Sequence, residues 1–305
     1  MNKRLGLVLC MVMLLMIACM PALSEGGIRL VDMEGRTVLL EAAATKVIAL
    51  NPADCEIVYA IGAEDSLVGR GEYCNYPEAV YELPSVNSGT EMNVEQILAL
   101  EPQIIIMSKM AQTTDQVDAL ENAGVRVVIS DAQSIEETYT AIEMIGALLG
   151  KTQEAETLVS DMKDGFAGVS AAATALDKTV YFEVSPLQWG LWTSGGDTFM
   201  DELAQICGLT NAFADVQGWA EVSQEQVIQR NPDFILTTTG YYGEGPLPAD
   251  EIMSRDGWEG MDAVENGAVY AIDSDSVSRP GPRLVDAAYE IMEFVTTFDT
   301  QADAA

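Results

Sequence analysis

The chain of 305 residues is 49% hydrophobic and 21% charged, which is the composition of an ordinary globular protein. Its formal net charge of −33 gives a surface that repels nucleic acids and anionic lipids, so we exclude nucleic-acid binding. Histidine is absent, which excludes a Ser-His-Asp triad and haem held by a histidine ligand.

The N-terminus predicts a secretory signal peptide over residues 1–24. A positively charged start precedes an apolar run to about Met20, shorter than the ~20 residues that a membrane-spanning helix needs. The sequence is compatible with two alternative cleavage sites. The four residues that end at Cys19 are similar to a lipoprotein box, with Met16 where leucine is usual, which makes Cys19 a candidate for lipidation. Ala22-Leu23-Ser24 instead fits ordinary cleavage. Either form is expected to work outside the cytoplasmic membrane.

Residues 25–150 predict a first α/β lobe. A hairpin is expected first, and then a buried strand that leads into a helix with Asn51 as its N-cap and Pro52 at its first position. The expected strands are 47–50, 67–69, 104–107 and 125–129, and the expected helices are 52–61, 112–122 and 134–149. Because strands alternate with helices, we expect a mostly parallel sheet that is covered on both faces.

Residues 151–176 predict one long amphipathic helix, and the alternative is two shorter helices that break near Gly165. Residues 177–305 predict a second α/β lobe. Its expected elements are strands at 179–184, 234–238 and 269–272 and helices at 197–207, 223–230 and 284–298. A long helix that joins two lobes would act as a stiff spine, so we expect little hinge closure.

The second lobe repeats a segment of the first. Residues 94–106 recur as 224–236, and Glu95 falls on Glu225. Each copy predicts a short helix, a proline break and a buried strand. This order of helix, proline and strand is common in α/β proteins, but it does not explain why both copies contain the same Glu-Gln pair. Two similar units predict two similar lobes, and a cleft between lobes is where small ligands bind.

Three cysteines follow the signal: Cys55, Cys74 and Cys207. Cys55 and Cys74 either form a disulfide in an oxidising compartment or stay as buried thiols.

Several short motifs follow one another in a characteristic order. They are Asn51-Pro52, Ile61-Gly62-Ala63, Tyr73 to Pro77, Asn93-Val94-Glu95, Thr193 to Leu203, Glu221 to Glu225, and Arg279 to Leu284. This series resembles the substrate-binding proteins of ABC importers for ferric siderophores and cobalamin, from about residue 28 to residue 300. Family members that carry bare metal ions use histidines, which this chain lacks.

The resemblance implies two mostly parallel α/β lobes bridged by one long helix, with the ligand in the cleft between them. It also implies that Glu95 and Glu225 pair with arginines of the membrane permease, whose partner is an ATPase. The alternative for both residues is a solvated glutamate at a helix start, which the helix dipole favours.

Aromatic and polar residues cluster at predicted strand ends, where α/β folds bind ligands. The candidates for ligand binding are Tyr73, Asn75, Tyr76, Trp189, Trp192, Trp219, Tyr241 and Tyr242. We expect about half of them to face the cleft and the others to lie in the core. Trp219 lies where cobalamin-binding relatives also carry an aromatic contact. Arg279 either meets an anionic ligand or forms a helix-end ion pair. Asn51 either helps to hold an anionic group or only caps its helix.

The function that these observations predict is an extracytoplasmic, monomeric receptor that delivers a ferric siderophore or a cobalamin-type chelate to a permease. No covalently bound cofactor, bound metal site or catalytic residue is expected. The sequence does not choose between the two chelates. A receptor for haem, with a tyrosine ligand, or for another chelate is the nearest alternative. An alternative from a different functional class is a secreted two-lobed enzyme, which the absence of histidine and the small number of cysteines disfavour.

Overall fold

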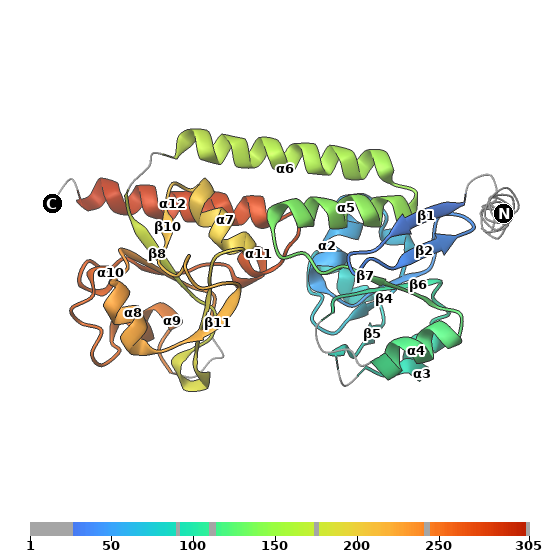
Figure 1. Cartoon of the computed structure of the whole chain (residues 1–305), viewed down its shortest axis with the longest axis horizontal. Coiled ribbons are helices and arrows are strands. Elements are labelled where there is room, and N and C mark those ends of the chain that lie inside the picture. The colour runs from blue at the N-terminus through green and yellow to red at the C-terminus, as the bar shows by residue number, and fades with distance from the viewer. Residues whose placement is uncertain (1–26, 90–91, 110–113, 174–176, 241–244, 303–305) are drawn as a thin grey trace, which may run out of the picture.

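The computed structural model describes residues 27–89, 92–109, 114–173, 177–240 and 245–302. Two α/β lobes lie side by side, and one long helix, α6, runs above both of them (Figure 1). The two-lobed, mostly parallel α/β architecture with a bridging helix is therefore confirmed. No helix in these ranges combines the length and the hydropathy that a membrane span requires.

The first lobe contains a five-stranded parallel sheet in the order β5-β4-β3-β6-β7. The strands are β3 (Val47–Ala49), β4 (Leu67–Gly71), β5 (Ser85–Val86), β6 (Ile104–Met107) and β7 (Arg126–Ile129). The helices are α2 (Pro52–Ala60), α3 (Val94–Ala99), α4 (Thr114–Asn122) and α5 (Ile135–Leu149). An antiparallel hairpin, β1 (Ile28–Val31) and β2 (Thr37–Leu40), precedes them. The central strands β3 and β6 are buried along their whole length because helices cover both faces of the sheet.

The second lobe contains a four-stranded parallel sheet in the order β10-β8-β12-β13. The strands are β8 (Thr179–Glu183), β10 (Thr210–Asn211), β12 (Phe234–Thr237) and β13 (Val269–Ala271). The helices are α7 (Phe199–Ile206), α8 (Gln224–Arg230), α9 (Pro248–Met253), α10 (Asp262–Glu265), α11 (Ser274–Ser278) and α12 (Leu284–Ala302). Outside the sheet, β9 (Leu191–Ser194) pairs antiparallel with β11 (Trp219–Val222), which the sequence analysis did not predict.

The repeated segment forms the same structure in both lobes. In the first lobe α3 leads into β6, and in the second lobe α8 leads into β12. Both strands lie inside their sheets rather than at an edge. The prediction of two similar units is therefore confirmed at the level of helix and strand.

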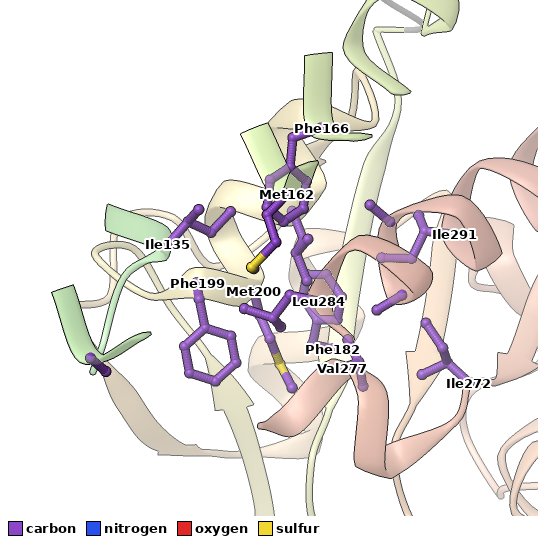
Figure 2. Packing of buried hydrophobic residues seen from close by; sticks show 14 of the residues in the cluster. Ile135, Met162, Phe166, Phe182, Phe199, Met200, Ile272, Val277, Leu284 and Ile291 are labelled. Carbon is purple, nitrogen blue, oxygen red and sulfur yellow. The ribbon is translucent and has the colours of Figure 1, made fainter. Parts of the chain in front are cut away.

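The helix α6 (Thr152–Ala172) is continuous, so the alternative of two shorter helices is wrong. Gly165 does not break it. A β-carbon at Gly165 would lie 2.6 Å from a methyl group of Val285, so this glycine is where α12 packs closely against α6. Figure 2 shows Met162 and Phe166 reaching from α6 toward Met200 of α7 and Leu284 of α12.

One buried cluster contains residues of both lobes. It includes Ile142 and Ile145 of α5, Phe182 of β8 and Leu284 of α12. Separating the lobes at this place would expose apolar surface to water, which is unfavourable. This continuous core favours the limited hinge motion that we expect from a stiff spine.

Candidate ligand-binding cleft

A cavity of about 500 Å³ lies between the two lobes. Its lining comes from Asn51, Pro52, Ala53, Asp54, Ser108, Ser130, Asp131, Ala132, Gln133, Phe199, Trp219, Ser278, Arg279 and Pro280. The lining residues of the first lobe directly follow β3, β6 and β7. They lie together because the carboxyl ends of parallel strands meet at one edge of the sheet. The volume is in the range of about 300–1,000 Å³ that is typical of small-molecule sites.

Asn51 and Asp54 form one side of the cavity at the start of α2. Pro52 occupies the first helical position, as expected, but the side chain of Asn51 does not cap the helix. Its amide nitrogen instead donates to Oδ2 of Asp54 at 3.0 Å and to the carbonyl oxygen of Ser130 at 3.4 Å. Asn51 therefore occupies the predicted N-cap position, but its side chain makes no capping hydrogen bond.

Asp54 is almost completely buried, with 1% of its surface exposed. Burial raises the pKa of its carboxyl to about 7, while hydrogen bonds from Ser130 and Asn51 lower it and the charge of Asp131 raises it further. The sequence does not distinguish Asp54 as a site residue, because an aspartate in the first turn of a helix is ordinary. Only its burial distinguishes it.

The opposite wall of the cavity is aromatic. The rings of Trp219 and Phe199 lie 5.5 Å apart between their centroids, with a tilted arrangement. The indole Nε1 of Trp219 donates to Oε1 of Gln133 at 3.3 Å, and the backbone N–H of Phe199 donates to the carbonyl oxygen of Gln133 at 2.8 Å. Gln133 of the first lobe thus holds both aromatic residues of the second lobe at the edge of the cavity.

Arg279 lines the cavity, but its charge is already matched. Its guanidinium donates to Oε1 of Glu56 at 2.9 Å, to Oδ1 of Asp275 at 2.6 Å and to Oδ1 of Asn75 at 2.7 Å. Asp275 lies one helical turn earlier, so the ion-pair alternative for Arg279 is present in the structure. Glu56 comes from the other lobe, so this pair also connects the lobes.

Among the ligand-binding candidates that the structure describes, Asn51, Trp219 and Arg279 lie in the lining and the others lie outside it. Asn75 is held between Asp275 and Arg279, and the ring of Tyr76 lies 4.3 Å from the guanidinium of Arg283. Tyr73, Trp189 and Trp192 are exposed. Tyr241, Tyr242 and Cys19 lie outside the described residues.

The charged lining of the cavity is more acidic than basic. Asp54 and Asp131 are its carboxyl groups, and Arg279 is its single cation among the described lining residues. Burial raises the pKa of Asp131 as well. Within the described ranges, no group of three or more Cys, Asp or Glu side chains is placed to hold a metal ion.

Glu95 and Glu225 occupy equivalent positions in the two lobes. Each is the second residue of its helix, after the N-caps Asn93 and Ser223, and each is exposed. Their helices α3 and α8 lie on the side of the two lobes that is opposite to α6 (Figure 1). Each lobe thus exposes one of these two glutamates to solvent, at the start of a corresponding helix.

The sequence profile of the periplasmic binding protein family matches residues 47–276. An uncharacterized ABC transporter substrate-binding lipoprotein of Bacillus subtilis, YvrC, is 34% identical over 271 residues, covering 87% of this chain and 84% of that protein. A vitamin B12-binding protein of Vibrio parahaemolyticus is 28% identical over 255 residues, covering 81% of this chain and 88% of that protein.

Among solved structures, a possible iron-binding (periplasmic solute-binding) protein of Staphylococcus epidermidis is 29% identical, with a TM-score of 0.69, covering 82% of this chain and 98% of that one. All three relatives are named as binding proteins and not as enzymes. The two lobes, the cleft between them and these similarities show that the chain belongs to the periplasmic binding protein family and is a substrate-binding protein of an ABC transporter.

Proposed function

We propose that this protein captures a corrinoid outside the cytoplasmic membrane and delivers it to an ABC permease. The observation that carries the choice of ligand is the charge of the cleft. Two carboxyl groups line it, and the single arginine is already paired with Glu56 and Asp275. Such a site favours a neutral or cationic ligand over an anionic one.

A corrinoid has the surface that this lining fits. The methyl groups and ring carbons of its macrocycle give it apolar surface, which suits the wall made by Trp219 and Phe199. Its rim carries amide groups, which can donate to Asp54 and Asp131 and exchange hydrogen bonds with Ser108. The 28% identity to a vitamin B12-binding protein supports the same choice.

The acidic lining of the cleft distinguishes between ferric siderophores of different net charge. A ferric catecholate carries several negative charges, and haem carries two propionates, so each would need a cation that the lining does not offer. A ferric hydroxamate is neutral or cationic and meets no such obstacle. It is the second candidate, and the 29% identity to a possible iron-binding protein supports it.

The exposed candidates serve the part of the ligand that a cavity of about 500 Å³ does not enclose. A corrinoid is larger than this volume, so part of it stays in the mouth of the cleft. We assign contacts there to the exposed residues Trp189 and Trp192. Tyr241 and Tyr242 stay candidates from the sequence alone, since they lie outside the described residues. Asn75 accepts a hydrogen bond from Arg279, and the ring of Tyr76 lies by the guanidinium of Arg283, so we assign both residues to support of the cleft border. Tyr73 is exposed, and we assign it to the same border.

Delivery uses Glu95 and Glu225, which we assign to arginines of the permease. Each carboxylate is solvent-exposed on its own lobe, and a charge-assisted pair on each lobe fixes the orientation of the complex. We assign the lipid anchor to Cys19, so the N-terminal signal is cleaved before Cys19 rather than after Ser24. The lipoprotein name of the 34% identical relative supports this anchor.

Isothermal titration calorimetry of the protein without residues 1–24 tests the ligand. Cyanocobalamin, cationic ferrioxamine B, a ferric tricatecholate and haem are titrated in parallel. We expect saturable binding of cyanocobalamin with a Kd below about 1 μM and no binding of the two anionic ligands. Tight binding of the tricatecholate or of haem, without cyanocobalamin, would contradict the proposal.

A further inference from the structure

We propose that Asp54 selects ligands that carry an N–H donor or a positive charge, and that its carboxyl releases a proton when such a ligand binds. This inference rests on the proposed function, since it concerns the same cleft. It assigns a specificity-determining residue that neither the sequence motifs nor the relatives point to.

Asp54 is a buried carboxyl group in the wall of the cavity. It is the third residue of α2, it lines the cavity, and it is almost fully buried. The side chains that hydrogen-bond its carboxyl are Asn51 and Ser130, and both are neutral. A carboxylate that is buried without a cation is costly, so Asp54 holds its proton to a higher pH than an exposed aspartate does.

The charged side chains described on the segments that border Asp54 are paired with other residues or are themselves acidic. On α2, Glu56 is paired with Arg279 and Arg283. After β7, Asp131 adds negative charge. After β6, Lys109 forms an ion pair with Glu34.

Arg279 follows α11 and lines the same cavity, but it is held by Glu56 and Asp275. No lysine or arginine among the described residues forms an ion pair with Asp54. The pKa of about 7 means that about half of the molecules carry the proton at pH 7.

Binding of a ligand shifts the equilibrium between the protonated and the ionised form of Asp54. An amide N–H or an ammonium group in the cavity donates to the ionised carboxyl in a charge-assisted hydrogen bond, which is stronger than one to the neutral acid. Binding therefore lowers the pKa of Asp54 and releases the proton. An anionic ligand in the same place would meet a second negative charge, or would have to keep the proton on Asp54. Selection by charge and proton release are thus two results of one contact.

Calorimetry with cyanocobalamin at pH 7, in two buffers of different ionisation enthalpy, measures the released protons. We expect about half a proton per ligand for the wild type, because the carboxyl is about half protonated, and none for Asp54→Asn. Between pH 8 and pH 5.5 the wild-type affinity should fall roughly thirtyfold, as expected if only the ionised form binds well. The affinity of Asp54→Asn should stay flat.

The matched control is Asp131→Asn, which removes a carboxyl from the same lining and should keep most of the proton release. Circular dichroism verifies that both variants are folded. Proton release that persists in Asp54→Asn, or a wild type that releases none, would overturn the role of Asp54 while leaving corrinoid binding intact. If cyanocobalamin does not bind, the same measurements with ferrioxamine B test Asp54 although the proposed function has failed. Binding of neither ligand would overturn both proposals.

Discussion

Glu56 of the first lobe accepts a hydrogen bond from Arg279 of the second lobe at 2.9 Å, although the two residues are 223 positions apart in the chain. Arg283 also donates to Glu56, through Nε and through NH2, both at 2.9 Å. The carboxylate of Glu56 is nearly buried, and α2 carries both Glu56 and the cavity residue Asp54. One ion-pair cluster therefore links the lobes directly beside the cleft.

Replacing Glu56 tests this link. Glu56→Gln leaves two arginines without their shared buried partner, and breaking a buried pair costs about 3 kcal/mol. We expect the free energy of unfolding in urea to fall by about this amount, or somewhat less because Arg279 and Arg283 keep Asp275 and Asp273. Asp273→Asn is the control, since it removes an exposed partner of Arg283 and should cost less than 1 kcal/mol, about the value of a surface pair. Equal losses in both variants would contradict the central role of Glu56.

The buried carboxyl of Asp54 predicts a dependence of stability on pH. Its pKa is raised from 3.8 to about 7 by burial, so the folded chain binds more protons than the unfolded chain between these values. The free energy of unfolding should therefore fall as the pH rises from 4 to 7. Asp54→Asn removes the ionisation and should stabilise the empty protein at pH 8, by up to about 4 kcal/mol. At pH 4 the gain should vanish, and a variant without any gain at pH 8 would contradict the assignment.

The aromatic wall predicts a loss of affinity when Trp219 is truncated. Trp219→Ala removes the stacking surface beside Phe199 and the hydrogen bond to Gln133, so we expect the Kd for cyanocobalamin to rise roughly thirtyfold. Trp189→Ala is the comparison variant, because the contact that we assign to Trp189 lies at the mouth of the cleft, where its ring is 64% exposed and outside the cavity lining. It should change the Kd less than about fivefold. A larger effect of Trp189 than of Trp219 would place the ligand outside the cavity.

The two equivalent glutamates predict a separation of binding from transport. The double variant Glu95→Ala with Glu225→Ala should keep its ligand affinity and lose ligand-dependent uptake in vesicles that contain the cognate permease and ATPase. Glu156→Ala with Asp161→Ala removes the same charge from the exposed side of α6 and should support normal uptake. Normal uptake by the first double variant would rule out docking through these carboxylates.

The three cysteines after the signal are predicted to be unreactive in the folded protein. Burial raises the pKa of Cys207 to about 12, and a hydrogen bond with Cys74, together with burial, raises the pKa of Cys55. All three are free and buried in the structure. A thiol-specific reagent at pH 8 should therefore detect none before unfolding and three after it. One thiol after unfolding would instead indicate a disulfide between Cys55 and Cys74.

Features that depend on neighbours in the chain could be predicted from the sequence. The apolar runs of β3 and β6 identify buried parallel strands, and Pro52 identifies the first position of α2. The repeat locates α3 with β6 and α8 with β12, because a helix start, a proline break and a buried strand each leave a local pattern. The continuous helix α6 follows from its apolar spacing.

Features that depend on distant contacts were decided only by the tertiary structure. Arg279 is a plausible anion-binding residue in the sequence, but packing places Glu56 against it from 223 positions away. Asp54 is an ordinary helix-start aspartate until packing buries it beside Asn51 and Ser130. Trp189 and Trp219 are both tryptophans in the sequence, but only Trp219 lies in the cavity lining. By itself the sequence determined the two-lobed α/β fold and the class of binding protein, since local periodicity and motif order carry that information. The charge and selectivity of the cleft depend on burial and pairing between lobes, and no local pattern encodes these.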